Sequence, residues 1–165
     1  MKEQQKKYEL TGEFIEHWSG KKLYRIRALV SFGTVVAGQL GGFIESEKNL
    51  DQSLSGDAWV YGNARVYGNA WVYGDARVSG DARVRSYAVI SERKMIFWAS
   101  NVGSENGTLT VFNGKDGLIV TRGCFTGTVD EFLAKSAEVH DDKTKNEYKL
   151  LTEVAKSRIL GVKDE

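Results

Sequence analysis

The sequence predicts a mainly β fold: a triangular solenoid of short parallel strands, with a β cap before it and an α+β cap after it. Two observations support this prediction. A six-residue unit repeats through residues 54–90, and the chain contains 18 glycines but no proline. A chain of this length would ordinarily hold about 8 prolines. Because proline removes a backbone donor, its absence favours stacked strands that use every N–H.

The repeat has a regular internal order. Branched apolar residues recur at positions 54, 60, 66, 72, 78, 84 and 90, alanine lies two residues before each from 58 to 88, and Gly-Asn or Gly-Asp fills most of the corners. We expect the apolar residue to point inward and glycine to adopt the unusual φ of a tight corner. Three units make one turn of eighteen residues, so residue n lies beneath residue n+18, about 4.8 Å away. An interior packed with valine and alanine leaves no room for a ligand, so we expect the function on the outside.

The chain divides into three predicted parts. Residues 1–27 form an N-terminal tail and β-hairpin cap around Ser19-Gly20, residues 28–91 form the solenoid, and residues 92–165 form an α+β domain of β-hairpins followed by two helices. A charged segment at 43–52 interrupts the weaker upstream repeat, and we expect it to protrude as a loop. Capping boxes beginning at Thr128 and Thr144 are expected to open the two helices.

Charge and cysteine content exclude several classes of protein. There are 23 basic and 22 acidic side chains, so bulk charge indicates neither a nucleic-acid binder nor an acidic mimic. The single cysteine, Cys124, cannot form an internal disulfide and is expected to be a buried small hydrophobe. The N-terminal residues lack an apolar stretch, and no run of about 18 apolar residues occurs. We therefore expect a cytoplasmic protein with no membrane partner.

Stacking by eighteen residues sorts the outward side chains into three faces. The first carries Trp71 and Tyr73 with Val89 above, the second carries Trp59 beneath Arg77, and the third carries Arg65 beneath Arg83 with Tyr67 beneath Arg85. Each face has its own chemistry. We expect the first face to be an oligomer interface, because exposed aromatic patches usually mark one. In the second face, Trp59 and Arg77 predict a cation–π pair, or a platform that stacks a base.

The third face predicts an anion site. Two arginines about 5 Å apart repel each other unless an anion lies between them. The anion would be a ligand phosphate or a neighbouring subunit's carboxylate, with Tyr67 as an aromatic wall and Arg85 on the same face. The alternative is a solvated arginine row, because arginines also stack and are weakly hydrated.

Several segments resemble known proteins. The six-residue repeat is similar to the hexapeptide signature of left-handed β-helix proteins, and this resemblance implies a left-handed parallel β-helix. The segments Leu23-Tyr-Arg-Ile, Ala37-Gly-Gln-Leu-Gly-Gly-Phe-Ile-Glu, Lys48-Asn-Leu, Ser100-Asn-Val-Gly-Ser and Gly123-Cys-Phe-x-Gly-Thr resemble a group of phage and prophage proteins of unassigned function. That second resemblance implies a homotrimer and a mobile-element setting, and it provides no established catalytic residues.

Enzymatic chemistry is weakly represented. Hexapeptide-repeat acyltransferases use a histidine between subunits, and a related class of carbonic anhydrases holds zinc with three histidines. Here there are only His17 in the cap and His140 near a helix end, where it would be a favourable partner of the helix dipole. We therefore expect no metal, no cofactor and no catalytic residue.

The expected function is binding. The prediction is a non-enzymatic phage or prophage homotrimer that acts in counter-defence, either by binding a host protein or by sequestering a phosphorylated, nucleotide-like ligand between subunits. An acyltransferase-like enzyme and a structural virion or assembly component are the alternatives.

Overall fold

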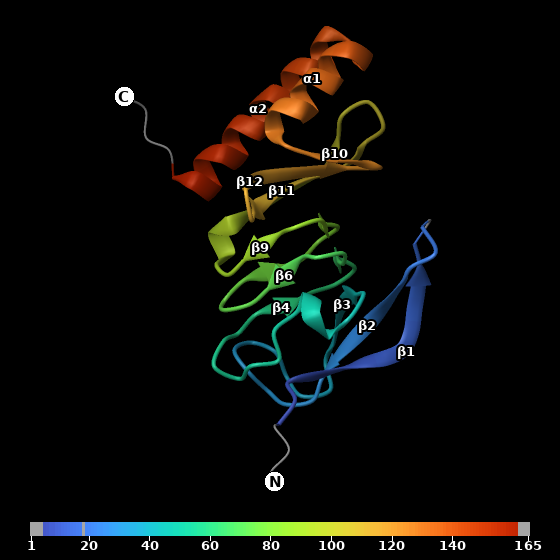
Figure 1. Ribbon diagram of the computed structural model, residues 1–165, viewed down its shortest axis with the longest axis vertical. Helices are drawn as coiled ribbons and strands as arrows, with labels where there is room; N and C mark the ends of the chain where they lie inside the picture. The colour runs from blue at the N-terminus through green and yellow to red at the C-terminus, as the bar shows by residue number, and fades with distance from the viewer. Residues whose placement is uncertain (1–4, 18, 162–165) are drawn as a thin grey trace.

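Closely spaced glycine turns divide the chain into short strands, and two helices follow them. The computed structural model describes residues 5–17 and 19–161. The strands are β1 (Tyr8–Glu16), β2 (Lys22–Ala28), β3 (Leu40–Ile44), β4 (Trp59–Val60), β5 (Arg65–Val66), β6 (Trp71–Val72), β7 (Arg77–Val78), β8 (Arg83–Val84), β9 (Val89–Ile90), β10 (Ile96–Val102), β11 (Gly107–Gly114), β12 (Gly117–Arg122) and β13 (Phe125–Gly127). The helices are α1 (Val129–Val139) and α2 (Asp142–Leu160), with short 3₁₀ turns at Glu47–Asn49 and Arg93–Met95. Figure 1 shows them as an elongated molecule with the helices at one end.

The predicted fold class, a left-handed parallel β-helix, is wrong. The described chain forms several small sheets: a five-stranded mixed sheet in the order β1-β2-β3-β5-β8, a four-stranded antiparallel sheet in the order β10-β11-β12-β13, and two pairs, β4-β7 and β6-β9. The sheets are not closed. The physical reason is that the repeat provides only two-residue strands, whereas the longer strands on either side are joined by tight turns that favour antiparallel pairing.

The eighteen-residue register within the repeat is confirmed. Trp59 pairs in parallel with Arg77, Arg65 with Arg83, and Trp71 with Val89. The apolar residue of each unit from 60 to 90, and the alanine before it, are buried. Glycines at 62, 68, 74 and 80 turn the corners with φ between +59° and +69°, a conformation that costs glycine little.

The segment at 43–52 is not a protruding loop. Phe43 and Ile44 belong to β3 and pair with Arg65 and Val66, while Leu50 is buried and bridges to Val72. The residues of these pairs are 22 positions apart in sequence, compared with 18 in the regular repeat. The turn between Leu50 and β4 therefore contains four more residues than a regular corner. The charged residues of this segment concealed its buried positions, and Leu54, which we expected inside, is 49% exposed.

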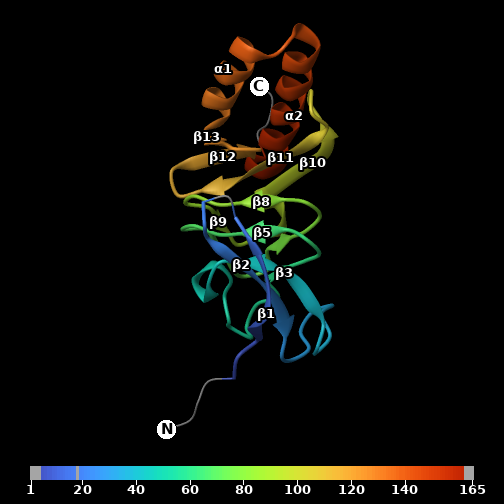
Figure 2. The ribbon, with the colours of Figure 1, turned by 90° about the vertical axis from the view of Figure 1, so that its right-hand side faces the viewer.

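The N-terminal hairpin is present as predicted and extends beside the parallel strands (Figure 2). Strands β1 and β2 pair antiparallel, and β2 joins β3 in the mixed sheet. The side chain of Gln52 anchors the hairpin base by accepting from the backbone N–H groups of Lys7 and Tyr8 and donating to the carbonyl of Tyr8. The far end of the hairpin lies next to β5, where His17 contacts Tyr67.

The antiparallel sheet closes the other end of the repeat. Alternate residues of β11 face opposite sides: Phe112 packs in the core of the repeat, whereas Leu109 and Val111 pack with the helices. Helix α1 begins with the predicted capping box at Thr128. Helix α2 begins earlier than predicted, because Asp141 is its N-cap and accepts from the N–H of Thr144. No helix in the described part of the chain is long and apolar enough to cross a lipid bilayer.

Candidate anion-binding cleft

Two arginines on neighbouring parallel strands form the base of a cleft. Arg65 of β5 pairs with Arg83 of β8, and Arg83 donates to the carbonyl of Asp81 over 2.8 Å. The buried Nε of Arg65 has no hydrogen-bond partner, and neither guanidinium takes part in an ion pair, among the described residues. Burial, followed by the charge of Arg65, lowers the pKa of Arg83. The two cations are therefore close together, and Asp81, which acts on the pKa of Arg83 in the opposite direction, forms no ion pair with either of them among the described residues.

Tyr67 links the hairpin to the repeat beside these arginines. It directly follows β5, and its side chain is almost completely buried. Its hydroxyl oxygen accepts from Nη1 of Arg85 over 3.0 Å and lies 3.1 Å from Nε2 of His17. His17 thus stands at the edge of the cleft although it is 50 residues away in sequence.

Arg85 is a clamp rather than an open anion ligand. Its Nε donates to Oγ1 of Thr126 over 2.6 Å, and its Nη2 donates to the carbonyl oxygens of Gly123 and Phe125 over 3.0 and 2.6 Å. These bonds use donors that an anion would otherwise engage. Arg85 therefore holds the β12–β13 turn against the repeat and fixes the shape of the cleft.

The repeat, the hairpin tip and the antiparallel sheet together enclose about 520 Å³. The lining residues are His17, Arg65, Tyr67, Asp81, Arg83, Arg85, Gly107, Thr108, Arg122, Gly123 and Cys124. Four of them are arginines and one is a carboxylate. All four residues expected on the third face thus lie at one cavity. Sequence reasoning missed Arg122, because nothing in the sequence links β12 to the repeat.

Trp59 and Arg77 are strand partners as predicted, but the expected cation–π pair on an outer face is wrong. Trp59 is 0% exposed and packs edge-on against Tyr8 and Phe32, at centroid distances of 6.1 and 5.3 Å. The guanidinium of Arg77 lies over Tyr61 instead, 5.9 Å from the ring centroid. The chain around Tyr8 and Phe32 covers Trp59, whose side chain is expected to face solvent if residues alternate along the strand. Trp59 and Arg77 belong to the β4–β7 pair, and neither lines the cleft.

The expected oligomer interface is an exposed aromatic surface. Trp71 is 45% exposed, and its ring stacks on Tyr73 with centroids 3.8 Å apart and planes 17° apart. Val89, its strand partner on β9, is half-buried. The role of this surface in a homotrimer stays a prediction.

Cys124 is exposed, so the expectation that it is buried is wrong. It lies on the β12–β13 turn, where Gly123 has φ +57° and directs the chain around the rim of the cleft. It is the single thiol of the chain and lines the cleft, so its alkylation rate can be used to test for a bound ligand.

Comparison with known proteins gives no assignment for this cleft. No protein-family model and no curated protein matches the chain. Within residues 5–17 and 19–161, no group of three or more His, Cys, Asp and Glu side chains is placed to hold a metal ion. The geometry and charge of the cleft are therefore the basis for inferring function.

His17 is expected to make the fold less stable as the pH falls below about 6.5. Burial, then the charges of Arg85, Arg65 and Lys21, lower the pKa of His17 from its ordinary value near 6.5, and Glu45 acts in the opposite direction. The unfolded chain therefore takes up this proton at a higher pH than the folded chain. The free energy of unfolding falls as the pH drops from about 6.5 to the lowered pKa.

Urea unfolding of the wild type and of His17→Gln across this pH range checks this expectation. The carboxylates titrate in both proteins, so the difference between the two curves isolates His17. The difference in the free energy of unfolding should change with pH between the lowered pKa and about 6.5. It should be constant at pH values well above 6.5. A difference that does not vary with pH would contradict the assignment.

Proposed function

We propose that this protein binds a small phosphorylated anion in the cleft, without turning it over. The observation that carries the proposal is the strand pairing of Arg65 with Arg83, neither of which forms an ion pair among the described residues, in a cleft lined by four arginines and a single carboxylate, Asp81. Two guanidinium groups present several N–H donors in planar forks that match phosphate oxygens. An anion between them relieves their repulsion, so binding and structural stability favour the same arrangement.

The surroundings of the pair support a nucleotide-like ligand rather than a lone ion. The cavity volume of about 520 Å³ lies within the range of about 300–1,000 Å³ found for sites that hold small organic ligands. Tyr67 and His17 add aromatic surface beside the arginines. In the phage or prophage setting that the sequence resemblance implies, we propose that sequestering such a ligand is the biological role, with a homotrimer as the assembled form.

An acyltransferase-like activity is the second candidate, because His17 lies in the cleft. Both ring nitrogens of His17 already have partners within the chain, Oγ of Ser19 at 2.7 Å and the hydroxyl of Tyr67 at 3.1 Å. A general base needs one nitrogen directed at the substrate. Binding without turnover is therefore the better supported function.

Titration with pyrophosphate and adenosine monophosphate tests the proposal. Either ligand should raise the unfolding temperature by mass action and slow the alkylation of Cys124 by neutral iodoacetamide. The double variant Arg65→Glu/Arg83→Glu should weaken binding at least about 100-fold, because charged hydrogen bonds contribute about 1.5–3 kcal/mol each.

Arg77→Glu is the matched control. Arg77 occupies the same position of the repeat on the neighbouring strand stack and does not line the cleft, so this variant should bind like the wild type. Wild-type protein that responds to neither ligand, or a double variant that titrates unchanged, would sink the proposal. Transfer or hydrolysis of acetyl-coenzyme A that His17→Gln abolishes would favour the enzyme instead.

A further inference from the structure

The hydroxyl of Tyr67 meets two hydrogen-bond partners at the wall of the cleft. Its oxygen lies 3.0 Å from Nη1 of Arg85 and 3.1 Å from Nε2 of His17, and both of these residues also line the cleft. A phenolic hydroxyl carries one donor hydrogen and can accept hydrogen bonds as well. Which partner supplies the hydrogen in each bond decides whether Tyr67 still has its own hydrogen to donate.

Arginine is the donor in the bond between Arg85 and Tyr67. A guanidinium group has only N–H groups and no acceptor. The oxygen of Tyr67 therefore accepts this bond, and the hydroxyl hydrogen is not used in it. The bonds of Arg85 to Thr126, Gly123 and Phe125 hold the guanidinium from the other side, so its orientation toward Tyr67 is fixed.

The turn at the hairpin tip determines the direction of the bond with His17. The backbone N–H of Ser19 donates to Nδ1 of His17 over 3.2 Å, and Oγ of the same serine lies 2.7 Å from Nδ1. Nδ1 is therefore an acceptor and carries no proton. Burial, then the charge of Arg85, lower the pKa of His17, so the ring is neutral at neutral pH and its one proton is on Nε2. Nε2 of His17 thus donates to Tyr67.

Tyr67 accepts both bonds and retains its own hydroxyl hydrogen. No other hydrogen bond of this hydroxyl occurs among residues 5–17 and 19–161. The residue is 5% exposed, so bulk water has little access to the group. A buried donor without an acceptor is unfavourable, and an acceptor atom supplied by a ligand removes this cost.

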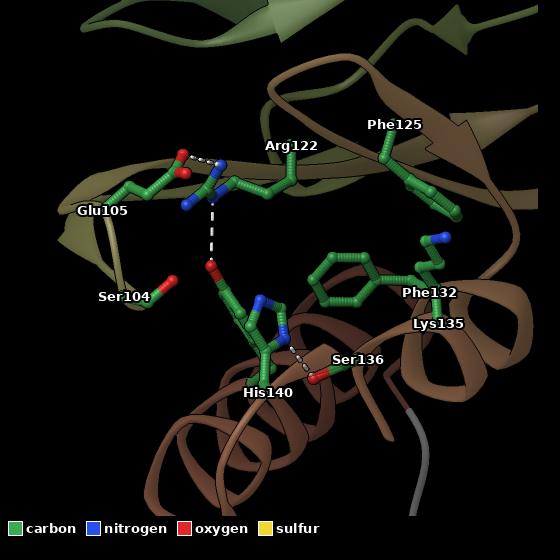
Figure 3. A pocket seen from close by; sticks show the side chains of 9 residues that line it. Ser104, Glu105, Arg122, Phe125, Phe132, Lys135, Ser136 and His140 are labelled. Carbon is green, nitrogen blue, oxygen red and sulfur yellow. Dashed lines mark hydrogen bonds and ion pairs between the residues drawn. The ribbon is translucent and has the colours of Figure 1, made fainter. Parts of the chain in front are cut away.

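Two arginines of the cleft have fewer donors to offer than their charge suggests. Nε of Arg122 donates to the hydroxyl of Tyr148 over 3.0 Å, and its Nη1 donates to Glu105 over 3.5 Å, as the dashed lines in Figure 3 show. Arg85 directs most of its donors to the β12–β13 turn. The hydroxyl of Tyr67 therefore supplies a donor at a point where these two arginines are already engaged.

We propose that Tyr67 donates its hydroxyl hydrogen to a phosphoryl oxygen of the ligand and so determines which atom the cleft accepts at this point. This inference rests on the proposed function and adds an atom that recognises the anion. The ligand atom that meets Tyr67 must be an acceptor that carries no hydrogen. A phosphoryl oxygen satisfies this requirement, whereas an ammonium or amide N–H group does not.

Tyr67→Phe removes the hydroxyl and keeps the ring. Titration of this variant with pyrophosphate and adenosine monophosphate should show at least about tenfold weaker binding than the wild type, because hydrogen bonds to charged groups are strong. Tyr61→Phe is the matched control, since Tyr61 occupies the same position of the repeat on the β4–β7 pair and does not line the cleft. The control should bind like the wild type. Unchanged binding by Tyr67→Phe would overturn the proposal.

Fluorotyrosine at position 67, with the fluorine next to the hydroxyl, separates donation to the ligand from a purely structural role. Fluorine makes the phenol more acidic, which strengthens the hydroxyl as a donor and weakens it as an acceptor. If Tyr67 donates to the ligand, the Kd for pyrophosphate should fall severalfold at neutral pH, where the phenol is still protonated. If Tyr67 only accepts from His17 and Arg85, the Kd should stay the same or rise, and that result would refute the proposal. This variant keeps the hydroxyl, so it gives the answer even where Tyr67→Phe is unstable.

The two proposals fail in different ways. Wild-type protein that binds neither ligand removes the proposed function and this inference with it. Binding that Arg65→Glu/Arg83→Glu abolishes but Tyr67→Phe leaves unchanged removes only the role of the Tyr67 hydroxyl. Binding that Tyr67→Phe weakens and fluorotyrosine strengthens supports both.

Discussion

Replacing Trp59 by alanine is expected to lower the free energy of unfolding by about 3–5 kcal/mol. Trp59 is fully buried, and its ring packs the rings of Tyr8 and Phe32 against the β4–β7 strand pair. Removing it leaves a cavity in the main core that its neighbours cannot fill without moving the backbone. Urea unfolding followed by circular dichroism measures the loss.

Trp71→Ala is the matched control, because Trp71 occupies the same position in its own unit of the repeat, directly before an inward valine. Since Trp71 is 45% exposed, its removal should cost the isolated subunit clearly less than the removal of the fully buried Trp59. If the predicted homotrimer forms through this surface, Trp71→Ala should instead reduce association in sedimentation experiments. Equal destabilisation by the two substitutions would show that the N-terminal segment does not cover Trp59 in solution.

Replacing Gly103 by alanine is expected to destabilise the protein by about 2–5 kcal/mol, the sum of backbone strain and overpacking. Gly103 has φ +78°, and a methyl group there would overlap the hydroxyl of Tyr148. Tyr148 is fully buried and accepts the hydrogen bond from Arg122. The substitution therefore disturbs the contact between α2 and the antiparallel sheet, and thermal unfolding measures the loss.

Gly161→Ala separates the two contributions. Gly161 has a similar φ of +62°, but a methyl group there would meet open space. Its substitution should cost only the strain, about 1–2 kcal/mol. A comparable loss for both variants would mean that Tyr148 moves aside at little cost.

The repeat was predictable because its information is local. A six-residue period determines which side chains lie one above another, so Arg65 and Arg83, and Tyr67 and Arg85, were correctly brought together. The six-residue period does not determine the structure of the segments before and after the repeat. The fold class was therefore wrong, since the antiparallel strand pairs on either side of the repeat form from segments with a different pattern.

The remaining residues of the cleft depend on contacts distant in sequence. His17 lies on the hairpin and Arg122 lies on the antiparallel sheet. Both reach the cleft because these elements pack against the repeat. Trp59 illustrates the same limit in the core. Alternation along its strand predicts an outward ring, but the chain around Tyr8 and Phe32 covers it.

The eighteen-residue register also sets the lengths by which this protein can grow. Inserting three units after Val78 would add one layer to each of the three strand stacks and return the antiparallel sheet to its present orientation. Inserting a single unit would place each later strand on the next stack, and Arg122 would no longer face the column of arginines. An insertion of eighteen residues should therefore keep Arg122 over the column of arginines, one strand spacing farther from the hairpin, whereas a shorter insertion would move Arg122 to another face of the repeat.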